Sequence, residues 1–425
     1  MRQSRSSTNR VTRRRLLSVS GALALTAACG SNTGRDGGRD GGAGGGPALD
    51  HWYHQYGEAG TEQAVRRYAS AYRKARVNVQ WRPGNYDQQT AAALLTRSAP
   101  DVFEGWPTLD QIRGGQVADL TGLLTGVRDD FHPAVLAPKT YQGKVYGIPQ
   151  VIDTQALYYR KSLLDKAGVR PPRTLDELID AAKALTTKHV KGLFLGNDGG
   201  AGVLGATPLR AAGLEPVTSD GEVGFDDPRA ARTLGKLHRF HADGSLLLGA
   251  PTDWSDPSAF VQGLTAMQWT GLWALPGIQR ALGDDFGVLP FPEDGPQGRP
   301  SVPVGAYGAA VSARSGHVEA AKAYVKWLWV ERTDYQRDFA LSYGFHIPAR
   351  LSLAKKTAVL AEGPAADAVR FATDYGYAGP LLWTDRSLTA FQDALSRIII
   401  DGADPAAQLR PVIATTRAEL KRVRS

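Results

Sequence analysis

The sequence contains little sulfur. Its 425 residues include one cysteine, Cys29, and two methionines. A single thiol cannot form a disulfide within the chain, so the fold must rely on its core, and an oxidising compartment is neither required nor excluded. Beyond the N-terminus, no apolar run approaches the roughly 18 residues that a membrane span needs. We therefore expect a soluble body.

The chain also lacks a large charge excess once its N-terminus is set aside. It has 50 Lys and Arg residues against 42 Asp and Glu residues, a formal net charge of +8, and residues 1–28 contribute six arginines and no acid. The remainder carries 44 basic against 42 acidic residues. Binding to nucleic acid requires basic residues clustered on the folded domain. The charge balance therefore gives no reason to expect a nucleic-acid partner.

Residues 1–28 have the organisation of an export signal. The arginines at 13–15 precede an apolar segment, residues 16–25, which small residues join to Cys29. A basic region, a short apolar region and a small-residue cleavage site are typical of a secretory signal peptide. Thr12-Arg13-Arg14-Arg15-Leu16-Leu17 also resembles a twin-arginine export signal.

Cys29 stands where a bacterial lipoprotein is cut and lipidated. Lipoprotein signals usually have leucine three residues before that cysteine, whereas this chain has Thr26 there and Leu25 one step further back. An ordinary secretory signal with an incidental cysteine is therefore the alternative. We expect Cys29 to be lipidated, which would anchor an extracytoplasmic protein to the outer face of the cell membrane.

Residues 29–47 are rich in glycine and contain no large apolar side chain. Such a composition cannot bury enough surface to fold, so we predict a flexible tether. About 378 residues follow, which is a length typical of two domains. No later low-complexity linker separates those domains. Two lobes between which the chain crosses more than once would account for that absence.

The rest of the chain alternates helix and strand patterns. An apolar repeat predicts an amphipathic helix at residues 65–72, and the alternation of residues 77–81 predicts a strand. Thr174-Leu175-Asp176-Glu177 is a capping box that predicts a helix start. Further short strands are expected at residues 101–103, 192–195 and 266–269. This rhythm predicts an α/β fold with mainly parallel sheets, in which ligands bind beyond the carboxyl ends of the strands.

Polar and aromatic residues follow three of these strands. They are Glu104-Gly105-Trp106, Gly196-Asn197-Asp198 and Thr270-Gly271-Leu272-Trp273. A sugar presents hydroxyls at its edge and an apolar C–H face, so its site needs planar acceptors and donors beside an aromatic ring. Trp106 and Trp273 would supply rings, whereas Glu104, Asn197 and Asp198 would bind hydroxyls. The interpretations that require no ligand are core packing for the tryptophans and helix capping for Asn197 and Asp198.

The order of several motifs identifies a family. The chain resembles the sugar-binding lipoproteins of bacterial ABC importers, the extracellular solute-binding proteins that share the maltose-binding-protein fold. The resemblance covers almost the whole chain after the tether. Its motifs are Ala99-Pro100-Asp101-Val102-Phe103; Gly143-Lys144-Val145-Tyr146-Gly147-Ile148-Pro149; Leu157-Tyr158-Tyr159-Arg160-Lys161; Pro171-Pro172-Arg173-Thr174-Leu175-Asp176-Glu177-Leu178; Ala266-Met267 with Gly271 and Trp273; and Ala320-Ala321-Lys322-Ala323-Tyr324 before Trp327-Leu328.

This resemblance implies a type II periplasmic-binding fold of two hinged α/β lobes. Lobe I would comprise residues 48–152 plus 305–352, and lobe II residues 153–304 plus 353–425. A mono- or oligosaccharide would be captured as the cleft closes about hinge residues near 153–154 and 305–306. Delivery would require an ABC permease with a separate ATPase. We expect a monomer with no cofactor, metal or catalytic residue.

The resemblance also implies ligand-binding positions. Glu104 and Trp106 follow the Pro-Asp strand, and Asp153 lies at the first crossover. Trp273 matches a stacking position, whereas Trp269 is assigned to packing because it lies within the strand. Weaker correspondences and the late aromatic complete the set: Tyr56, Glu58, Tyr307 and Trp383.

Two classes of enzyme also match parts of the sequence. Residues 200–205 fit the dinucleotide fingerprint G-x-G-x-x-G, but residues 196–199 separate the match from its strand. A secreted carbohydrate-active enzyme would need two opposed carboxylates, and Glu104 and Asp153 would have to supply them.

Two histidine pairs with the spacing H-x-x-H raise the question of a metal site. His51 and His54 would point to opposite faces of a strand, and His238 and His241 lack a third ligand at matching spacing. Neither pair therefore predicts a metal site. A carbohydrate-sensing lipoprotein with no role in transport also stays open as an interpretation of the sequence.

Overall fold

Two β-sheets flanked by helices organise the part of the chain that the structure describes. The computed structural model describes residues 46–305 and 307–425. Residues 46–425 form one unit. The predictions for the export signal, for Cys29 and for nearly all of the tether lie outside the described residues.

The first sheet has the strand order β2-β1-β3-β12-β6. β1 pairs in parallel with β2 and β3, while β12 runs antiparallel to both β3 and β6. A separate two-stranded ribbon joins β4 to β5. The bounds are β1 Ala48–His54, β2 Arg76–Arg82, β3 Val102–Gly105, β4 Thr140–Tyr141, β5 Lys144–Val145, β6 Ile148–Pro149 and β12 Gly308–Val311.

Helices cover this sheet and complete the first lobe, here called lobe I. Tyr68 of α1, Leu49 and Tyr53 of β1, and Trp329 are fully buried in one apolar cluster. The helices are α1 Thr61–Ala71, α2 Tyr86–Leu94, α3 Leu109–Arg113, η1 Thr121–Leu124, η2 Arg128–Asp130, α4 Pro133–Leu136, η3 Ala137–Lys139, α11 Val318–Lys326, η5 Trp327–Glu331 and α12 Thr333–Leu341.

The second sheet is centred on β7 and has the order β14-β11-β7-β9-β8. Two short strands, β10 and β13, also pair with β7. β7 is long because it supplies hydrogen-bonding edges to β9, β10, β11 and β13. The bounds are β7 Val151–Tyr159, β8 Lys191–Phe194, β9 Thr265–Gly271, β10 Gly287–Leu289, β11 Val302–Gly305, β13 Ile347–Pro348 and β14 Gly376–Tyr377.

Helices on the second sheet form lobe II with it. The predicted capping box is confirmed, since Thr174 and Glu177 bond each other's backbone at the start of α6. Fully buried Leu178, Leu234, Trp269 and Phe391 join α6, α8, β9 and α15 in one core. The helices are α5 Lys161–Ala167, α6 Leu175–Leu185, α7 Thr207–Ala211, α8 Pro228–Ala242, α9 Ser258–Val261, η4 Leu272–Ala274, α10 Leu275–Leu282, α13 Leu351–Ala354, η6 Ala358–Leu360, α14 Gly363–Asp374, α15 Asp385–Asp401 and α16 Pro405–Arg424.

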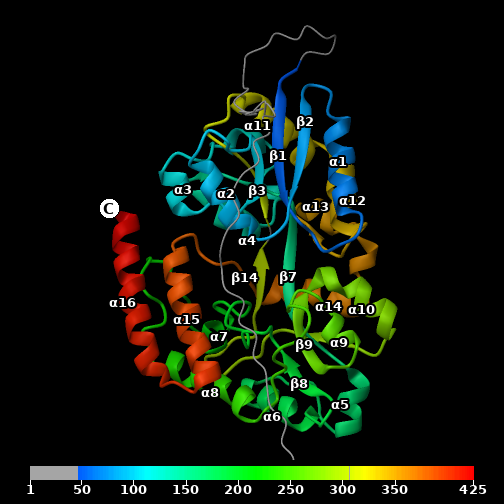
Figure 1. Ribbon diagram of the computed structural model, residues 1–425, viewed down its shortest axis with the longest axis vertical. Coiled ribbons are helices and arrows are strands. Elements are labelled where there is room, and N and C mark those ends of the chain that lie inside the picture. Colours follow the sequence, from blue (N-terminus) through cyan, green and yellow to red (C-terminus); the bar gives the residue numbers. More distant parts are fainter. Residues whose placement is uncertain (1–45, 306) are drawn as a thin grey trace, which may run out of the picture. The chain divides into compact units, whose positions relative to one another are not determined.

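The chain passes between the sheets in three places, all beside β7 (Figure 1). The first passage is β6 to β7, the second is β11 to β12, and the third runs through β13. Asp153 of β7 pairs with Gly305 of β11, while Ile152 pairs with Ile347 of β13. The passages therefore lie side by side, which supports a hinge there. The lobe boundaries drawn from the sequence stay a prediction.

The prediction of mainly parallel sheets is wrong for the second sheet. Only β8 with β9 and β11 with β14 are parallel among its described pairs, and every pair that includes β7 is antiparallel. Within lobe II, β9 and β10 pair with β7 in the antiparallel sense, and β11 runs antiparallel to β7 as the chain leaves this lobe.

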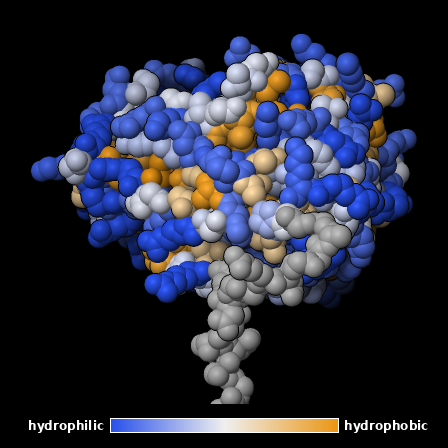
Figure 2. All heavy atoms as spheres, turned by 90° about the horizontal axis from the view of Figure 1, so that it is seen from above, coloured by the Kyte–Doolittle hydropathy of each residue, from blue (hydrophilic) through white to orange (hydrophobic). Residues whose placement is uncertain are grey.

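The surface of the body agrees with its balanced charge. Figure 2 shows a mainly hydrophilic face on which apolar residues form small separate patches. Among the described residues, no helix is both long and apolar enough to cross a membrane.

Candidate functional site

The middle of β7 carries Asp153 and Gln155 on one face of the second sheet, because residues two apart in a strand point the same way. Their cross-strand partners are glycines: Gly305 opposite Asp153 and Gly271 opposite Gln155. Directly paired residues share a face. The missing side chains of both glycines would therefore lie beside the two polar ones.

Indole rings occupy the space above these glycines. A Cβ added to Gly305 would lie 2.2 Å from Cη2 of Trp106, and one added to Gly271 would lie 2.0 Å from Cζ3 of Trp273. The glycines are separated by two strand spacings, roughly 10 Å, and by two residues, about 7 Å, along the strand. The structure thus brings Trp106, Asp153 and Trp273 to one face of β7.

Trp106 also meets Trp383 across a pocket of about 140 Å³. Residues 106–110 and Pro138 of lobe I and residues 379–381 and 383–385 of lobe II line it. Trp106 keeps 40% of its surface exposed, while Trp383 packs edge-on against Phe225 and Phe391. Two tryptophans predicted from separate parts of the sequence therefore face one cavity.

Glu104 is fully buried at the end of β3 and is bonded within lobe I. Its Oε1 accepts from the Tyr56 hydroxyl at 2.6 Å, and its Oε2 lies 2.8 Å from Nδ1 and 3.0 Å from the backbone N of His54. Burial alone would lower the pKa of His54, but the Glu104 charge outweighs burial and raises it. These bonds support an anchoring role for Glu104. Its direct contact with a ligand stays a prediction.

Asp153 and Glu58 are joined by a residue that the sequence interpretation missed. His346 lies before β13, with Nδ1 against Oδ1 of Asp153 and Nε2 3.3 Å from Oε1 of Glu58. His346 is 5% exposed, whereas the side chains of Glu58 and Asp153 keep 13% and 29%. The structure therefore places both predicted carboxylates in one cluster at the hinge.

Lys139 and Tyr307 complete the polar surroundings of Trp106. The Lys139 ammonium lies 4.1 Å from the centre of the Trp106 ring. Complete burial lowers the pKa of Lys139 to about 7, against the opposing effect of the Asp153 charge. The Tyr307 hydroxyl donates to Asp87 at 3.2 Å, and its ring lies 4.6 Å from that of His54.

Asn197 and Asp198 follow β8 and bond the backbone of loops. Asn197 exchanges two hydrogen bonds with the backbone of Ala250, at 2.8 and 3.0 Å. Asp198 accepts from the backbone N–H groups of Gly200 and Gly202. These bonds favour the capping interpretation. They also place a carboxylate on the amides that would have to receive a phosphate in a dinucleotide site.

The two tryptophans of β9 and its following turn differ. Trp269 is completely buried in the lobe II core, and its Nε1 donates to Gln155 at 2.9 Å, as expected of a packing residue. Trp273 is half-buried, donates to the Ser255 backbone and meets the ring of Trp254 edge-on.

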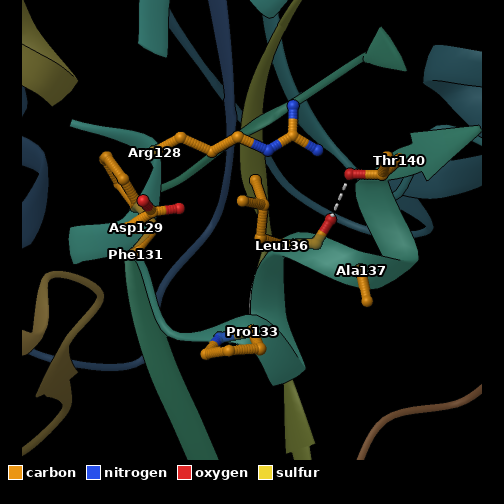
Figure 3. Close-up of a pocket in the computed structure, with 7 residues that line it drawn as sticks. All are labelled: Arg128, Asp129, Phe131, Pro133, Leu136, Ala137 and Thr140. Carbon is orange, nitrogen blue, oxygen red and sulfur yellow. Dashed lines mark hydrogen bonds between the residues drawn. The ribbon is translucent and has the colours of Figure 1, made fainter. Parts of the chain in front are cut away.

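A larger pocket of about 660 Å³ lies elsewhere in lobe I, around α4. Figure 3 shows the Arg128 side chain extended across it toward Thr140, whose hydroxyl bonds Leu136. None of the predicted ligand residues lines this pocket. The cavity that Trp106 and Trp383 line is therefore the better candidate, despite its smaller size.

The histidine pairs do not form metal sites among the residues that the structure describes. His51 is buried against Tyr324, while His54 bonds Glu104, so the two point apart as predicted. His238 bonds the backbone of Ile399. In the described ranges, no group of three His, Cys, Asp or Glu side chains is arranged around a metal position.

The sequence interpretation also missed His54, Lys139 and His346. One signal was available for His346. Ile-Pro occurs at 148–149 and again at 347–348, and both copies form strands beside the hinge. A repeated dipeptide at two crossovers would have directed attention to the residue before the second copy.

Residues 58–329 match the model of the bacterial extracellular solute-binding proteins. The chain belongs to this family. Its fold is therefore the predicted two-lobed, type II periplasmic-binding fold, and its relatives are substrate-binding proteins of ABC transporters, which the family's description places outside the cell.

Similar proteins and solved structures support this assignment. The diacetylchitobiose-binding protein of Streptomyces coelicolor is 26% identical over 346 residues, which cover 73% of this chain and 76% of that protein. The GacH receptor of Streptomyces glaucescens, solved without ligand and with acarbose, matches with a TM-score of 0.76 and 25% identity over 88% of this chain and 99% of that one. A maltose-bound Thermotoga maritima protein matches at 0.71 and 19% identity, over 89% of this chain and 100% of the other.

Proposed function

We propose that this solute-binding protein captures a mono- or oligosaccharide and delivers it to an ABC import permease. The observation that carries the proposal is that Trp106 and Trp383 line one pocket, while Trp106 also covers Gly305, the partner of Asp153 on the sheet face that carries Trp273. Flat apolar rings next to carboxylates match the C–H face and hydroxyl edge of a sugar. Relatives named for diacetylchitobiose, maltotriose and raffinose support this ligand class.

Closure of the lobes about β7 would complete the site. A ligand shifts the protein toward a closed state only if it contacts that state better. Trp106 of lobe I and Trp383 of lobe II provide such contacts, because only a closed cleft places both on one ligand. The permease and its ATPase would be separate proteins, and we propose that this subunit acts as a monomer without covalent chemistry.

A thermal-shift screen tests the ligand class. The mature body, residues 48–425, is heated with maltose, maltotriose, diacetylchitobiose or mannobiose, alongside Trp106→Ala and the control Trp327→Ala. A sugar that binds only the folded protein must raise the melting temperature. We expect at least one sugar to do so, with loss in Trp106→Ala alone. A solute other than a sugar as the sole stabiliser would overturn the ligand class.

Incubation of the same sugars with the protein separates binding from hydrolysis. Stoichiometric retention supports capture, whereas release of shorter sugars would favour a secreted enzyme that uses Glu104 and Asp153 as its carboxylates. A carbohydrate-sensing lipoprotein would bind the sugar, yet cells that lack the protein would still take it up.

We also propose that the mature protein is tethered to the membrane through lipid on Cys29. Replacement of Cys29 by alanine should release the protein from the membrane fraction into the medium. A variant that stays membrane-bound would contradict the anchor.

A further inference from the structure

His346 joins two elements that the ligand would have to contact together. Glu58 lies on the loop after β1, in lobe I, and Asp153 lies on β7 at the hinge. The imidazole stands between them with one nitrogen toward each carboxylate. At 5% exposed, it is shielded from water, so these two contacts replace its hydration.

An imidazole can donate to both carboxylates only when both of its nitrogens carry protons. Burial alone would lower the pKa of His346, but the charges of Asp153 and Glu58 outweigh it and raise the pKa to about 10. The pKa of Glu58 is lowered in turn, because its bond to His346 outweighs burial. The shifts of His346 and Glu58 agree, which indicates that this pair is charged near neutral pH.

Two charged side chains and one hydroxyl group surround this bridge. His54, at the end of β1, adds positive charge near Glu58 and carries the bond to Glu104. Burial lowers the pKa of Lys139 of η3, and the negative charge of Asp153 partly offsets this lowering. Tyr56 contributes a hydroxyl that donates to Glu104. Because these neighbours are already bonded to Glu104 or packed on Trp106, the Asp153 carboxylate is the exposed acceptor of the group.

We propose that His346 is a positioning residue of the sugar site, which holds the carboxylates of Glu58 and Asp153 in place so that Asp153 accepts a ligand hydroxyl. This role rests on the proposed sugar-binding function. A carboxylate has more than one acceptor position on each oxygen, so the bond to His346 leaves Asp153 able to bind ligand. Gly305, the cross-strand partner of Asp153, lies under Trp106, so displacement of Asp153 would also disturb that ring.

The first experiment measures the dissociation constant of the sugar with the largest thermal shift in the four-sugar panel. The variants are His346→Gln, Asp153→Asn, their double mutant and the control His238→Gln, which lies on α8 and bonds a backbone carbonyl. We expect at least a tenfold weakening for each single variant at the hinge, no change in the control, and a double mutant within threefold of Asp153→Asn, because residues of one network are not additive.

A purely structural histidine gives another pattern. His346→Gln would then lower the melting temperature while the dissociation constant stays within twofold, and the positioning role would be overturned. If His346→Gln does not fold, Glu58→Gln replaces it. That variant keeps the bond to Asp153, and we expect a three- to tenfold weakening.

The second experiment needs no ligand. Titration of the His346 ring by NMR should give a midpoint well above 9, which falls by at least one pH unit in Asp153→Asn. A midpoint near 6.5 in the wild type would overturn the charged bridge. Failure of every sugar to bind would overturn the sugar site and the positioning role with it, while a high midpoint would still establish the ion pair.

Discussion

The two walls of the cleft use polar groups in opposite ways. In the lobe I wall, His54 and Tyr56 both bond the fully buried Glu104, and Lys139 is completely buried beside Trp106. In the lobe II wall, the polar side chains are exposed and bond loop backbone: Asn197 bonds Ala250 of a second loop, and Asp198 bonds its own loop.

This difference indicates in which wall a substitution should lower the stability more. Buried charges are stable only while each keeps its partner, so the loss of one leaves the others unsatisfied. Loop bonds at a water-exposed surface are replaced by water at small cost. We therefore expect the lobe I wall to determine stability and both walls to determine affinity.

The largest expected effect is the loss of stability when Glu104 is replaced. Glu104→Ala removes the partner of His54 and Tyr56 and should lower the free energy of unfolding by about 3 kcal/mol, as measured by urea denaturation. Asp198→Ala, its counterpart in the lobe II wall, should cost about 1 kcal/mol. Equal losses in the two variants would abolish the proposed difference between the walls.

The second effect concerns the aromatic rings, on which the walls should agree. Trp106→Ala and Trp273→Ala should each weaken binding of the stabilising sugar by about 2 kcal/mol, or roughly thirtyfold, if both rings stack on it. Asn197→Ala, which breaks a loop bond, should change affinity less than threefold. Calorimetric titration measures the affinities of all three variants. A large effect of Asn197→Ala would indicate that Asn197 binds the ligand.

The third effect is a change in the pH dependence of stability. The pKa of His346 is raised to about 10, so its stabilising contribution is complete below about pH 6.5 and is lost as pH rises to 10. The pKa of Lys139 is lowered to about 7, so the cost of its burial is present below pH 7 and is relieved at higher pH. These two trends oppose each other in the wild type.

Single variants should expose each trend. From pH 7 to 10 the free energy of unfolding of Lys139→Met should fall relative to wild type, and that of His346→Gln should rise, each by up to about 1.4 kcal/mol per pH unit. Thermal unfolding across that range measures both. Parallel curves for the three proteins would show that neither group titrates as its burial implies.

The smallest effect is expected where the lobes touch at the surface. Arg422 near the end of α16 bonds Asp110 of α3 at 2.8 and 3.0 Å, and the Arg422 and Asp110 side chains are 46% and 60% exposed. Exposed ion pairs contribute little, so Arg422→Ala should change the free energy of unfolding by less than about 1 kcal/mol. A larger loss would mean that surface contacts, in addition to the hinge, hold the lobes together.

Local signals in the sequence predicted local structure well. The capping box at Thr174 specified a helix start because both of its bonds lie within four residues. The packing of Trp269 followed from its place inside a strand, and the positions of Trp106 and Trp383 followed from family motifs. Asn197 and Asp198 were ambiguous, since the same side chains cap loops and bind sugars.

The contacts that span long stretches of sequence were beyond such signals. The bond between Glu58 and His346 joins residues 288 positions apart. Nothing near either residue specifies the other, because only the third passage of the chain brings them together. The antiparallel pairs of β7 were not predicted either, because each joins β7 to a strand that lies far along the chain.

By itself the sequence determined the family and the alternation of helices and strands, because each depends on motifs or periodicities within a few tens of residues, and the aromatic ligand contacts stay a prediction. Only the tertiary structure decided which carboxylates are anchored and which stay exposed. That distinction arises from burial and from partners supplied by distant elements, as when Glu104 is covered by lobe I while Asp153 is held, still accessible, by His346.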